Sequence, residues 1–321
     1  MRLKEIDQMN IFISKKSQSL YYRSLNNELK RQNKIFFFHR HKTEFITTLV
    51  LFLFSKVKKI HIINLLPNYS INLEGVATTT VHVDCGHLHT VQWPEISNEL
   101  IFKIEKTLTL SNKIVYVTDA LKNESKTLAP DNHNNNGITA LMQFDMKEVG
   151  KLQQRYKKFD LITVSTSQKR KNWSEFFKII SQTKRSLDIC LVIDSIFESK
   201  YGQELEKAKQ QGHRINLYKS IEREELNKLY QASVYYLQCS TYEGFGIPIF
   251  EAIAHGATAL VRPTSILEEI YHEFAVFYKN TNQVSDILTE NEMRMNKATE
   301  IRRKYCDVKG FLNRIEAFAS E

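Results

Sequence analysis

The chain is poor in cysteine, glycine and proline, with only four, ten and five of these residues among 321. The cysteines are Cys85, Cys190, Cys239 and Cys306; they form no Cys-x-x-Cys pair, and their spacings are too wide for a zinc knuckle. Isolated cysteines are typical of free thiols in a reducing compartment. We therefore expect a cytoplasmic protein without a structural zinc site.

No hydrophobic run is long enough to span a membrane. The most apolar stretch, Phe45–Phe54, is far shorter than the ~20 residues that a spanning helix needs. The charged start, Met1–Glu5, has no apolar core behind it, so no signal peptide is predicted. A basic segment, Lys56–Lys59, follows the apolar stretch. A peripheral contact with the anionic inner face of the cell membrane is therefore one interpretation, and a buried helix over 44–56 is the simpler one.

The composition also limits the classes of partner. A net charge of +9 favours anionic partners such as nucleotide diphosphates, lipid-linked phosphates or an anionic membrane. The basic residues are spread over both halves of the chain, without a basic strip interleaved with aromatic residues, so no nucleic-acid partner is expected. A hydrophobic content of 42% and a charged content of 25% are typical of a soluble globular protein.

Strand and helix patterns alternate along the whole chain. In the first half, strands are expected at 10–14, 34–38, 59–65, 77–83 and 113–117, and helices at 21–32, 44–56, 97–110 and 120–128. In the second half, strands are expected at 160–165, 187–193, 215–218 and 234–239, and helices at 173–181, 203–211, 222–232 and over most of 285–318. This alternation predicts an α/β protein with mostly parallel sheets. A polar loop at 131–137 and a basic segment at 151–158 place a domain boundary near residue 152.

The most informative segment runs from Glu243 to Glu251 and reads E-G-F-G-I-P-I-F-E. It follows a predicted buried strand and leads into a predicted helix, so the local order is strand, glycine loop, helix. In an open α/β sheet, ligands bind in the crevice beyond the carboxyl ends of the strands. Gly244 and Gly246 would let backbone N–H groups approach an anionic or hydroxyl-rich ligand there.

The two carboxylates of this segment stand eight positions apart. A carboxylate can hold a vicinal diol through two hydrogen bonds. Glu243 in the loop and Glu251 in the first helical turns could thus hold two diols, such as those of the sugar ring and the ribose of a nucleotide sugar. A glutamate near a helix N-terminus is also a favourable partner for the helix dipole, so each residue taken alone is equally well explained as structural.

The segment 215–270 resembles the donor-binding region of glycosyltransferase family 4. Members of that family carry a Glu-x7-Glu motif, often as E-G-F-G-x-P-x-x-E-A, and Glu243–Ala252 matches every one of those positions. The resemblance implies the GT-B architecture, in which two Rossmann-like domains face each other across a cleft. It also implies an acceptor-side domain at 1–152, a donor domain at 153–321 and a last helix, over 305–318, that crosses back to the first domain.

The resemblance implies roles for the residues of the second domain. The transferred sugar would lie beside Glu243 and the loop that contains Gly244, Phe245, Gly246 and Ile247, and Glu251 would hold the ribose. Lys169, Arg170 and Lys171 follow a predicted strand, where three cations are well placed to hold a diphosphate. Lys171 matches the lysine of the family. Thr166 stands where the family has an arginine, and Arg170 or Lys169 could replace it.

A histidine-rich segment of the first domain resembles the part of the family that faces the transferred sugar. It reads H-V-D-C-G-H-L-H over 82–89 and is followed by Pro94 and Glu95 at a longer interval than usual. His82 and Asp84 are taken as catalytic candidates, in competition with His87 and His89. A metal site at the last two histidines and a buried core histidine are the alternatives. The resemblance implies that neither a metal nor another cofactor is needed.

The resemblance implies a retaining glycosyltransferase, which moves a sugar from a nucleotide-diphosphate sugar to a glycan or lipid-linked acceptor in surface polysaccharide synthesis. The alternative is a catalytically silent GT-B accessory subunit that binds a partner transferase or a glycan. The missing arginine at position 166 and the glycine-free loop 14–18 favour this alternative, and the intact pair of glutamates argues against it.

Overall fold

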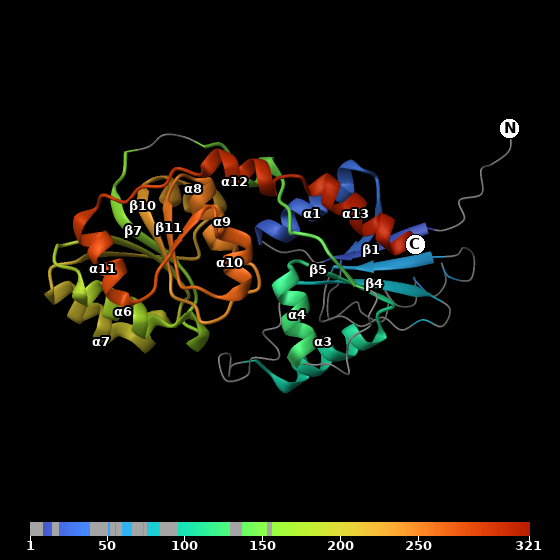
Figure 1. Ribbon diagram of the computed structural model, residues 1–321, viewed down its shortest axis with the longest axis horizontal. Helices are drawn as coiled ribbons and strands as arrows, with labels where there is room; N and C mark the ends of the chain where they lie inside the picture. Colours follow the sequence, from blue (N-terminus) through green and yellow to red (C-terminus); the bar gives the residue numbers. More distant parts are fainter. Residues whose placement is uncertain are drawn as a thin grey trace. The chain divides into compact units, whose positions relative to one another are not determined.

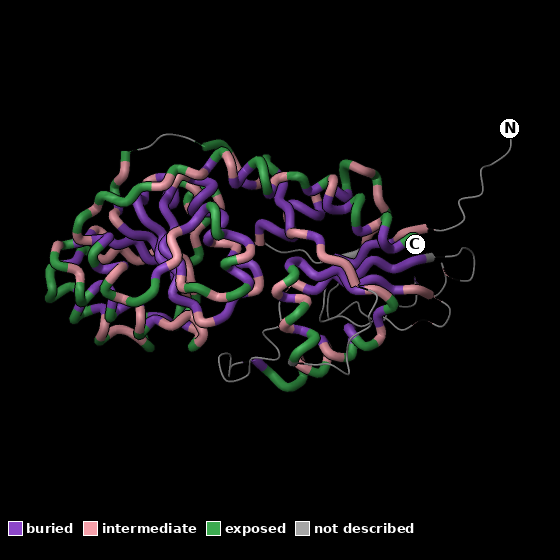
Figure 2. Tube along the Cα trace, viewed as in Figure 1, coloured by how far each residue is buried: buried purple, intermediate pink, exposed green. Residues whose placement is uncertain are grey.

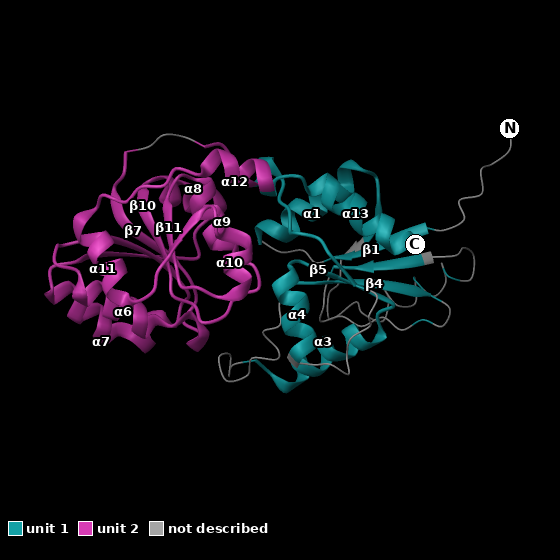
Figure 3. Ribbon diagram, viewed as in Figure 1, with its two compact units in different colours: residues 1–88, 96–148, 305–321 teal, residues 89–95, 149–304 magenta. Residues whose placement is uncertain are grey.

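The computed structural model describes residues 9–14, 19–38, 51, 55, 60–65, 73, 76–83, 96–128, 137–152 and 156–321. The chain forms two compact units, shown in Figure 3. Unit 1 comprises residues 1–88, 96–148 and 305–321, and unit 2 comprises residues 89–95 and 149–304. The helix expected over 44–56 lies almost entirely outside the described residues, as does the segment from Asp84 to Glu95.

Unit 1 is built on a parallel sheet with the strand order β2-β1-β3-β4-β5-β6. Its described strands are β1 (Met9–Ser14), β2 (Ile35–Phe38), β3 (Ile60–Asn64), β4 (Ala77–His82), β5 (Lys113–Tyr116) and β6 (Gly137–Thr139). Its described helices include α1 (Leu20–Arg31), α3 (Asn98–Leu110), α4 (Asp119–Leu128) and α13 (Val308–Ser320), and α5 (Met146–Val149) lies where the chain passes into unit 2. The strands are rich in apolar and β-branched residues, and most residues of β1, β4 and β5 are buried (Figure 2).

The C-terminal helix α13 belongs to unit 1, since it packs on α1 and β3. The Phe311 ring meets the Tyr21 ring edge-on, with 6.5 Å between centroids, and Glu316 accepts a hydrogen bond from Lys34 at 2.7 Å. The side chain of Asp307 caps the helix by accepting from the Gly310 N–H at 3.0 Å. The first strand β1 and the helix α13 therefore belong to the same unit.

Unit 2 is built on a second parallel sheet with the order β12-β11-β10-β7-β8-β9. Its strands are β7 (Phe159–Val164), β8 (Asp188–Ile193), β9 (Arg214–Lys219), β10 (Ser233–Gln238), β11 (Thr258–Val261) and β12 (Ala275–Phe277). Its helices are α6 (Trp173–Gln182), α7 (Phe197–Gln210), α8 (Arg223–Gln231), α9 (Ile247–Ala254), α10 (Ser265–Tyr271), α11 (Thr281–Glu290) and α12 (Ala298–Tyr305). The helices lie on both sides of the sheet, with α6, α7 and α11 on one side and α8 and α9 on the other (Figure 1).

The core of unit 2 contains a cluster of aromatic rings under α6 and α7. Trp173 is 2% exposed, and its ring lies 4.4 Å from that of Phe197 and 5.2 Å from that of Phe176. Burying each such ring contributes about 1.5–3 kcal/mol. The Trp173 indole N–H also donates to the Thr166 carbonyl at 2.7 Å, so the same side chain fixes the loop that follows β7.

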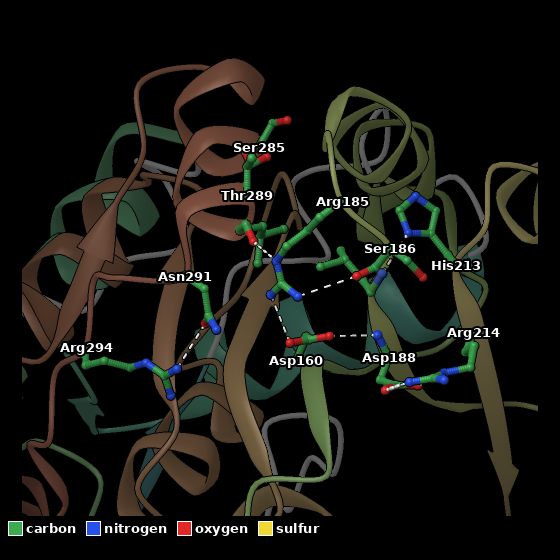
Figure 4. A network of polar contacts seen from close by, with 12 residues as sticks. Asp160, Arg185, Ser186, Asp188, His213, Arg214, Ser285, Thr289, Asn291 and Arg294 are labelled. Atoms are coloured by element: carbon green, nitrogen blue, oxygen red, sulfur yellow. Dashed lines mark hydrogen bonds and ion pairs between the residues drawn. The ribbon is translucent and has the colours of Figure 1, made fainter.

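A polar network fastens the amino-terminal edge of this sheet (Figure 4). Arg185 donates to the Asp160 carboxylate at 2.8 Å and to the Leu288 carbonyl at 2.7 Å, so it joins the start of β7 to the end of α11. The second oxygen of Asp160 accepts from the Asp188 N–H at 2.8 Å, and Asp188 pairs with Arg214 at the start of β9. The hydrogen bond from Arg214 lowers the pKa of Asp188. Because all strands are parallel, this network lies at the edge opposite to the loops that follow the strands.

Candidate functional site

The strand order of unit 2 reverses between β7 and β10. The chain runs outward from β7 through β8 to β9, then returns to place β10 on the other side of β7. Such a reversal opens a crevice at the carboxyl ends of the two central strands, where α/β proteins bind ligands. The loops after β7 and β10 meet at this point, since the Thr241 N–H donates to the Arg170 carbonyl at 2.8 Å.

Glu243, in the loop after β10, makes ion pairs with two cations from the loop after β7. Its Oε1 lies 2.5 Å from the Lys171 Nζ, and its Oε2 lies 3.2 Å from the Arg170 Nη1. The Gln238 amide donates to the same Oε1 at 2.8 Å. The predicted residues Glu243, Arg170 and Lys171 are therefore brought together, although about seventy positions separate the two loops in the sequence.

The charge of this cluster suits an anionic ligand. Glu243 is only 8% exposed, and burial alone would raise its pKa, but Lys171 and Arg170 outweigh burial and hold the pKa at about 2. The carboxylate is therefore ionised at neutral pH. The formal charges of Lys171, Arg170 and Glu243 sum to +1.

The three residues expected to offer cations differ in their placement. Lys169–Lys171 form one turn of 3-10 helix, and Asn172 in the left-handed conformation (φ 54°) leads directly into α6. Arg170 and Lys171 are largely covered and point toward Glu243, while Lys169 is exposed. Arg170 thus supplies a guanidinium to the cluster even though Thr166, itself exposed, stands where the resemblance implies an arginine.

A cavity of about 550 Å³ opens beside the cluster. It is lined by three groups of residues: Val164, Ser165, Thr166, Gln168, Arg170 and Lys171 from the end of β7 and its loop, Val192, Ile193 and Asp194 from the end of β8, and Pro248 from α9. Asp194 Oδ2 accepts hydrogen bonds from the Ser167 N–H and hydroxyl at 2.7 and 2.9 Å, which holds the β7 loop against β8. The cavity has the size of a small-molecule site.

Gly246 makes the sharp entry into α9 possible. Its φ of 72° lies in the left-handed region, and it is the residue immediately before the helix. A Cβ at this position would lie 2.7 Å from the Ile249 Cδ1 and 3.1 Å from the Leu267 Cδ2. Phe245 is buried against Tyr271, with ring centroids 5.9 Å apart, so its side chain anchors the loop; Gly244 and Ile247 are half-buried.

Glu251 lies in the second turn of α9 and has a different set of partners. It is 4% exposed; its Oε1 pairs with Arg223, the first residue of α8, and its Oε2 accepts from the Tyr230 hydroxyl at 3.1 Å. The Tyr230 ring stacks on His255 at 6.0 Å between centroids. The His255 Nδ1 lies 2.8 Å from the backbone carbonyl of Glu251, so the helical turn and the carboxylate are fixed together.

Buried polar groups lie between the two glutamates. The Tyr236 hydroxyl donates to the Gln238 Oε1 at 2.6 Å, and the Gln238 amide nitrogen donates to Glu243. The Tyr236 ring lies 6.3 Å from that of Tyr230, whose hydroxyl contacts Glu251. Satisfied buried networks of this kind hold their members in one geometry.

The catalytic candidates of the first domain are placed differently. His82 is the last residue of β4 and is fully buried, with its ring 5.8 Å from that of Tyr116. In this structure its ring is part of the core of unit 1 and is not offered to solvent. Asp84, His87 and His89 lie outside the described residues, so the choice among them stays a prediction.

The described residues also bear on metal binding and on membrane insertion. They contain no group of three or more His, Cys, Asp and Glu side chains arranged to hold a metal ion. None of their helices is long and apolar enough to cross a bilayer. Cys190 and Cys239 carry free thiols, and burial raises the pKa of Cys190 to about 12.

The site residues that were not predicted from the sequence include Asp194, Arg223, Tyr230 and Gln238. Gln238 carries a visible signal, because it is a polar residue at the end of an otherwise apolar strand, S-V-Y-Y-L-Q. Arg223 and Tyr230 belong to an ordinary amphipathic helix pattern. Nothing in that pattern distinguishes Arg223 from a surface residue or Tyr230 from a core residue.

The sequence model of the family described as "Glycosyl transferases group 1" matches residues 146–302, slightly less than half of the chain. The matched segment coincides closely with unit 2 and contains both glutamates and the two cations. A search among curated proteins found no match.

Solved structures resemble the whole chain. Sucrose-phosphate synthase from Thermosynechococcus elongatus has a TM-score of 0.71 at 13% identity and covers 98% of this chain and 100% of its own. HepE from Anabaena, in complex with UDP and glucose, has a TM-score of 0.66 at 13% identity, with 97% and 99% covered. The pneumococcal O-GlcNAc transferase GtfA, in complex with UDP and GlcNAc, has a TM-score of 0.60 at 16% identity; the match covers 84% of this chain and 59% of that enzyme.

These likenesses concern the fold, and they confirm the predicted α/β class with two parallel sheets of the GT-B type. The chain spans only about three fifths of the pneumococcal transferase but nearly all of HepE and of sucrose-phosphate synthase. Residues 146–302 thus carry the sequence pattern of glycosyl transferases group 1, within a chain that has the GT-B fold.

Proposed function

We propose that the protein is a retaining glycosyltransferase of family 4, which transfers a sugar from a nucleotide-diphosphate sugar to a glycan or lipid-linked acceptor in surface polysaccharide synthesis. The observation that carries the proposal is the Glu243–Lys171–Arg170 cluster at the crevice of unit 2. The cluster places a carboxylate, which can bind sugar hydroxyls, beside an ammonium and a guanidinium, which can bind phosphate. All three lie within the segment that matches the transferase family.

UDP is the nucleotide to test first. HepE and the pneumococcal transferase were both solved with UDP, and HepE also with UDP-glucose. A diphosphate is a multiply charged anion, and Lys171 and Arg170 are cations. Coulomb attraction would therefore draw the diphosphate to these two side chains. Glu243 would then be released from part of its ion pairing and could accept hydrogen bonds from the sugar hydroxyls.

The chemistry asked of these residues is stabilisation of the leaving group. As the glycosidic bond to the diphosphate breaks, negative charge grows on the departing oxygen, and a fixed ammonium and guanidinium at that point lower the barrier. The acceptor would attack from the face that the diphosphate leaves, and the departing phosphate would take the acceptor's proton. This route retains the configuration at the anomeric carbon and requires no protein nucleophile.

The test begins with a thermal-shift screen of nucleotide sugars on the purified chain, because a ligand that binds only the folded state raises its apparent stability. The best ligand is then used radiolabelled in a transfer assay with membrane extracts and soluble glycans as acceptors. We expect Glu251→Ala to weaken binding of the sugar donor and Lys171→Ala to lower turnover. Normal transfer by both variants would refute the assignment.

The accessory-subunit alternative predicts a different outcome of the same screen. A silent subunit would neither transfer the sugar nor slowly hydrolyse the donor, even if a nucleotide stabilised it. Donor hydrolysis by the purified chain, lost in Lys171→Ala, would therefore exclude this alternative. One reason for the accessory-subunit alternative was the missing arginine at position 166. Arg170 weakens that reason, because it brings a guanidinium to the cluster.

A further inference from the structure

Arg223 has donors left over beside Glu251. Its Nη1 donates to the Glu251 Oε1, while its Nε and Nη2 are buried and have no hydrogen-bond partner among the described residues. The side chain as a whole is 16% exposed. Leaving donors of a charged group buried and unpaired costs free energy, on the order of 1–3 kcal/mol or more. Such groups in a folded protein call for an explanation, and a catalytic or binding role is one to consider.

The two nitrogens define the shape of the missing partner. In the planar guanidinium, Nε–H and one Nη2–H lie on the same edge and point in parallel, so together they form a fork for two adjacent acceptor atoms. The partner should therefore present two neighbouring oxygens. A phosphate, a carboxylate and a vicinal diol all meet this first condition.

Glu251 decides among these three classes. Its ionised carboxylate only accepts hydrogen bonds, and one of its oxygens already accepts from Tyr230. A ligand that lies against both Arg223 and Glu251 must accept from the first and donate to the second. A hydroxyl does both, whereas phosphate and carboxylate oxygens carry no proton to donate and are repelled by Glu251.

The net charges of the two clusters point the same way. Arg223 and Glu251 form a pair whose formal charges cancel, whereas Lys171, Arg170 and Glu243 together keep a positive surplus. A nucleotide sugar has a charged diphosphate and an uncharged ribose. The diphosphate matches the positive cluster, and the ribose matches the neutral pair.

We propose that Arg223 is a specificity-determining residue that clamps the ribose diol of the donor together with Glu251. Glu251 accepts hydrogen bonds from the two hydroxyls, and the Nε–Nη2 fork donates hydrogen bonds to the lone pairs of the same oxygens. Because the fork is covered in this structure, binding includes a rotation of the Arg223 side chain toward the ligand. The proposal rests on the proposed function, since it presumes a nucleotide donor.

The experiment measures binding of UDP, 2′-deoxy-UDP and inorganic pyrophosphate by calorimetry to the full chain. The variants are Arg223→Met, which removes the donors, and Arg223→Lys, which keeps the charge beside Glu251 but lacks the fork. Lys228→Met, on the exposed face of the same helix, is the control. The wild-type chain should bind UDP about tenfold more tightly than 2′-deoxy-UDP. Both Arg223 variants should weaken UDP binding and reduce that ratio at least threefold, with pyrophosphate affinity unchanged.

The outcomes separate the clamp from the proposed function. If the wild-type chain binds no nucleoside diphosphate, the proposed function fails and the clamp fails with it. If UDP binds and the Arg223 variants match the wild type, only the clamp is overturned. If the variants weaken UDP, 2′-deoxy-UDP and pyrophosphate equally, Arg223 contacts phosphate and the clamp is again wrong. Thermal melting shows whether Arg223→Met is folded, and Arg223→Lys decides the matter if it is not.

Discussion

The Nζ of Lys171 lies 2.5 Å from the Oε1 of Glu243, so the residue expected to meet the diphosphate and the residue expected to meet the sugar contact each other. This ion pair is largely buried, with 11% of the lysine side chain and 9% of the glutamate side chain exposed. A nucleotide sugar bound between them would replace the Lys171–Glu243 ion pair with an ion pair between Lys171 and the diphosphate. Binding would therefore break few interactions that water would have to replace.

The first prediction concerns turnover. Lys171→Ala should lower kcat by about a hundredfold or more, since removing one fixed donor to a developing oxyanion has costs of that order. Lys169→Ala is the matched control, because Lys169 belongs to the same helical turn but is exposed, and it should keep nearly full activity. Equal losses in both variants would show that the loop acts through its general charge and not through Lys171.

The second prediction concerns acid stability. The pKa of Glu243 is about 2 in the folded chain and 4.5 ordinarily, so the unfolded chain takes up the proton first as the pH falls. The stabilisation is complete above pH 4.5 and is lost as the pH approaches 2. At about 1.4 kcal/mol per pKa unit it is on the order of 3 kcal/mol. Glu243→Gln should remove it and also take the carboxylate away from Lys171 and Arg170.

Urea unfolding at pH 7 and pH 3 measures this effect. The wild-type chain should lose more stability than Glu243→Gln between the two values. Glu206→Gln, which breaks the exposed pair with Lys209, should change stability by less than about 0.5 kcal/mol at either pH. A Glu243→Gln variant as stable as the wild type at pH 7 would contradict the role of the ion pair.

Sequence reasoning recovered most of unit 2 because its elements have strong local patterns. The strands β7, β8 and β10 are short runs of mostly buried residues. A glycine followed two residues later by a proline indicates the start of α9. The region 285–318, expected to be largely helical, contains the three helices α11, α12 and α13. Asn291 ends α11 in the left-handed conformation (φ 56°), and Asp307 caps the start of α13. These local turns interrupt a segment whose composition is otherwise helical.

The contacts of the site could be predicted only in part. The family resemblance indicated both Glu243 and Lys171, but their ion pair depends on β10 returning beside β7, which is a long-range event. Arg223 lies 28 positions before Glu251 and carries no motif, so only the packing of α8 against α9 shows that the two meet. His82 matched a family pattern locally, while the tertiary structure buries it within unit 1.

The third prediction concerns the glycine before α9. Gly246→Ala should destabilise the chain by about 1–3 kcal/mol, because the left-handed backbone penalises any Cβ and this Cβ would lie 2.7 Å from Ile249. Gly212→Ala isolates the first cause, since Gly212 has a φ of 93° with nothing within 4 Å of the added atom. It should cost about 1 kcal/mol. Thermal melting of both variants compares the two, and equal losses would mean that the contact with Ile249 is relieved by small shifts.

The fourth prediction concerns His255, whose buried ring packs against Tyr230 beneath Glu251. Burial lowers its pKa from 6.5 to about 4, so the folded chain resists the proton that the unfolded chain accepts. Stability should therefore fall as the pH is lowered from 6.5 toward 4, by up to about 3 kcal/mol from this residue. His255→Asn keeps a donor for the Glu251 carbonyl but cannot titrate. It should be less stable at pH 7 and lose less stability on acidification.

Measurement of the unfolding free energy at pH 7, 5.5 and 4.5 tests the difference in slope between the wild type and His255→Asn. The slope of the variant should not vanish, because His61 in unit 1 also has its pKa lowered to about 4 by burial and keeps its own contribution. Parallel curves for the two proteins would mean that the His255 site admits the proton, by water or by local opening. In that case the carboxylate of Glu251 would be held less firmly than its contacts indicate, and its grip on the donor should weaken over the same pH range.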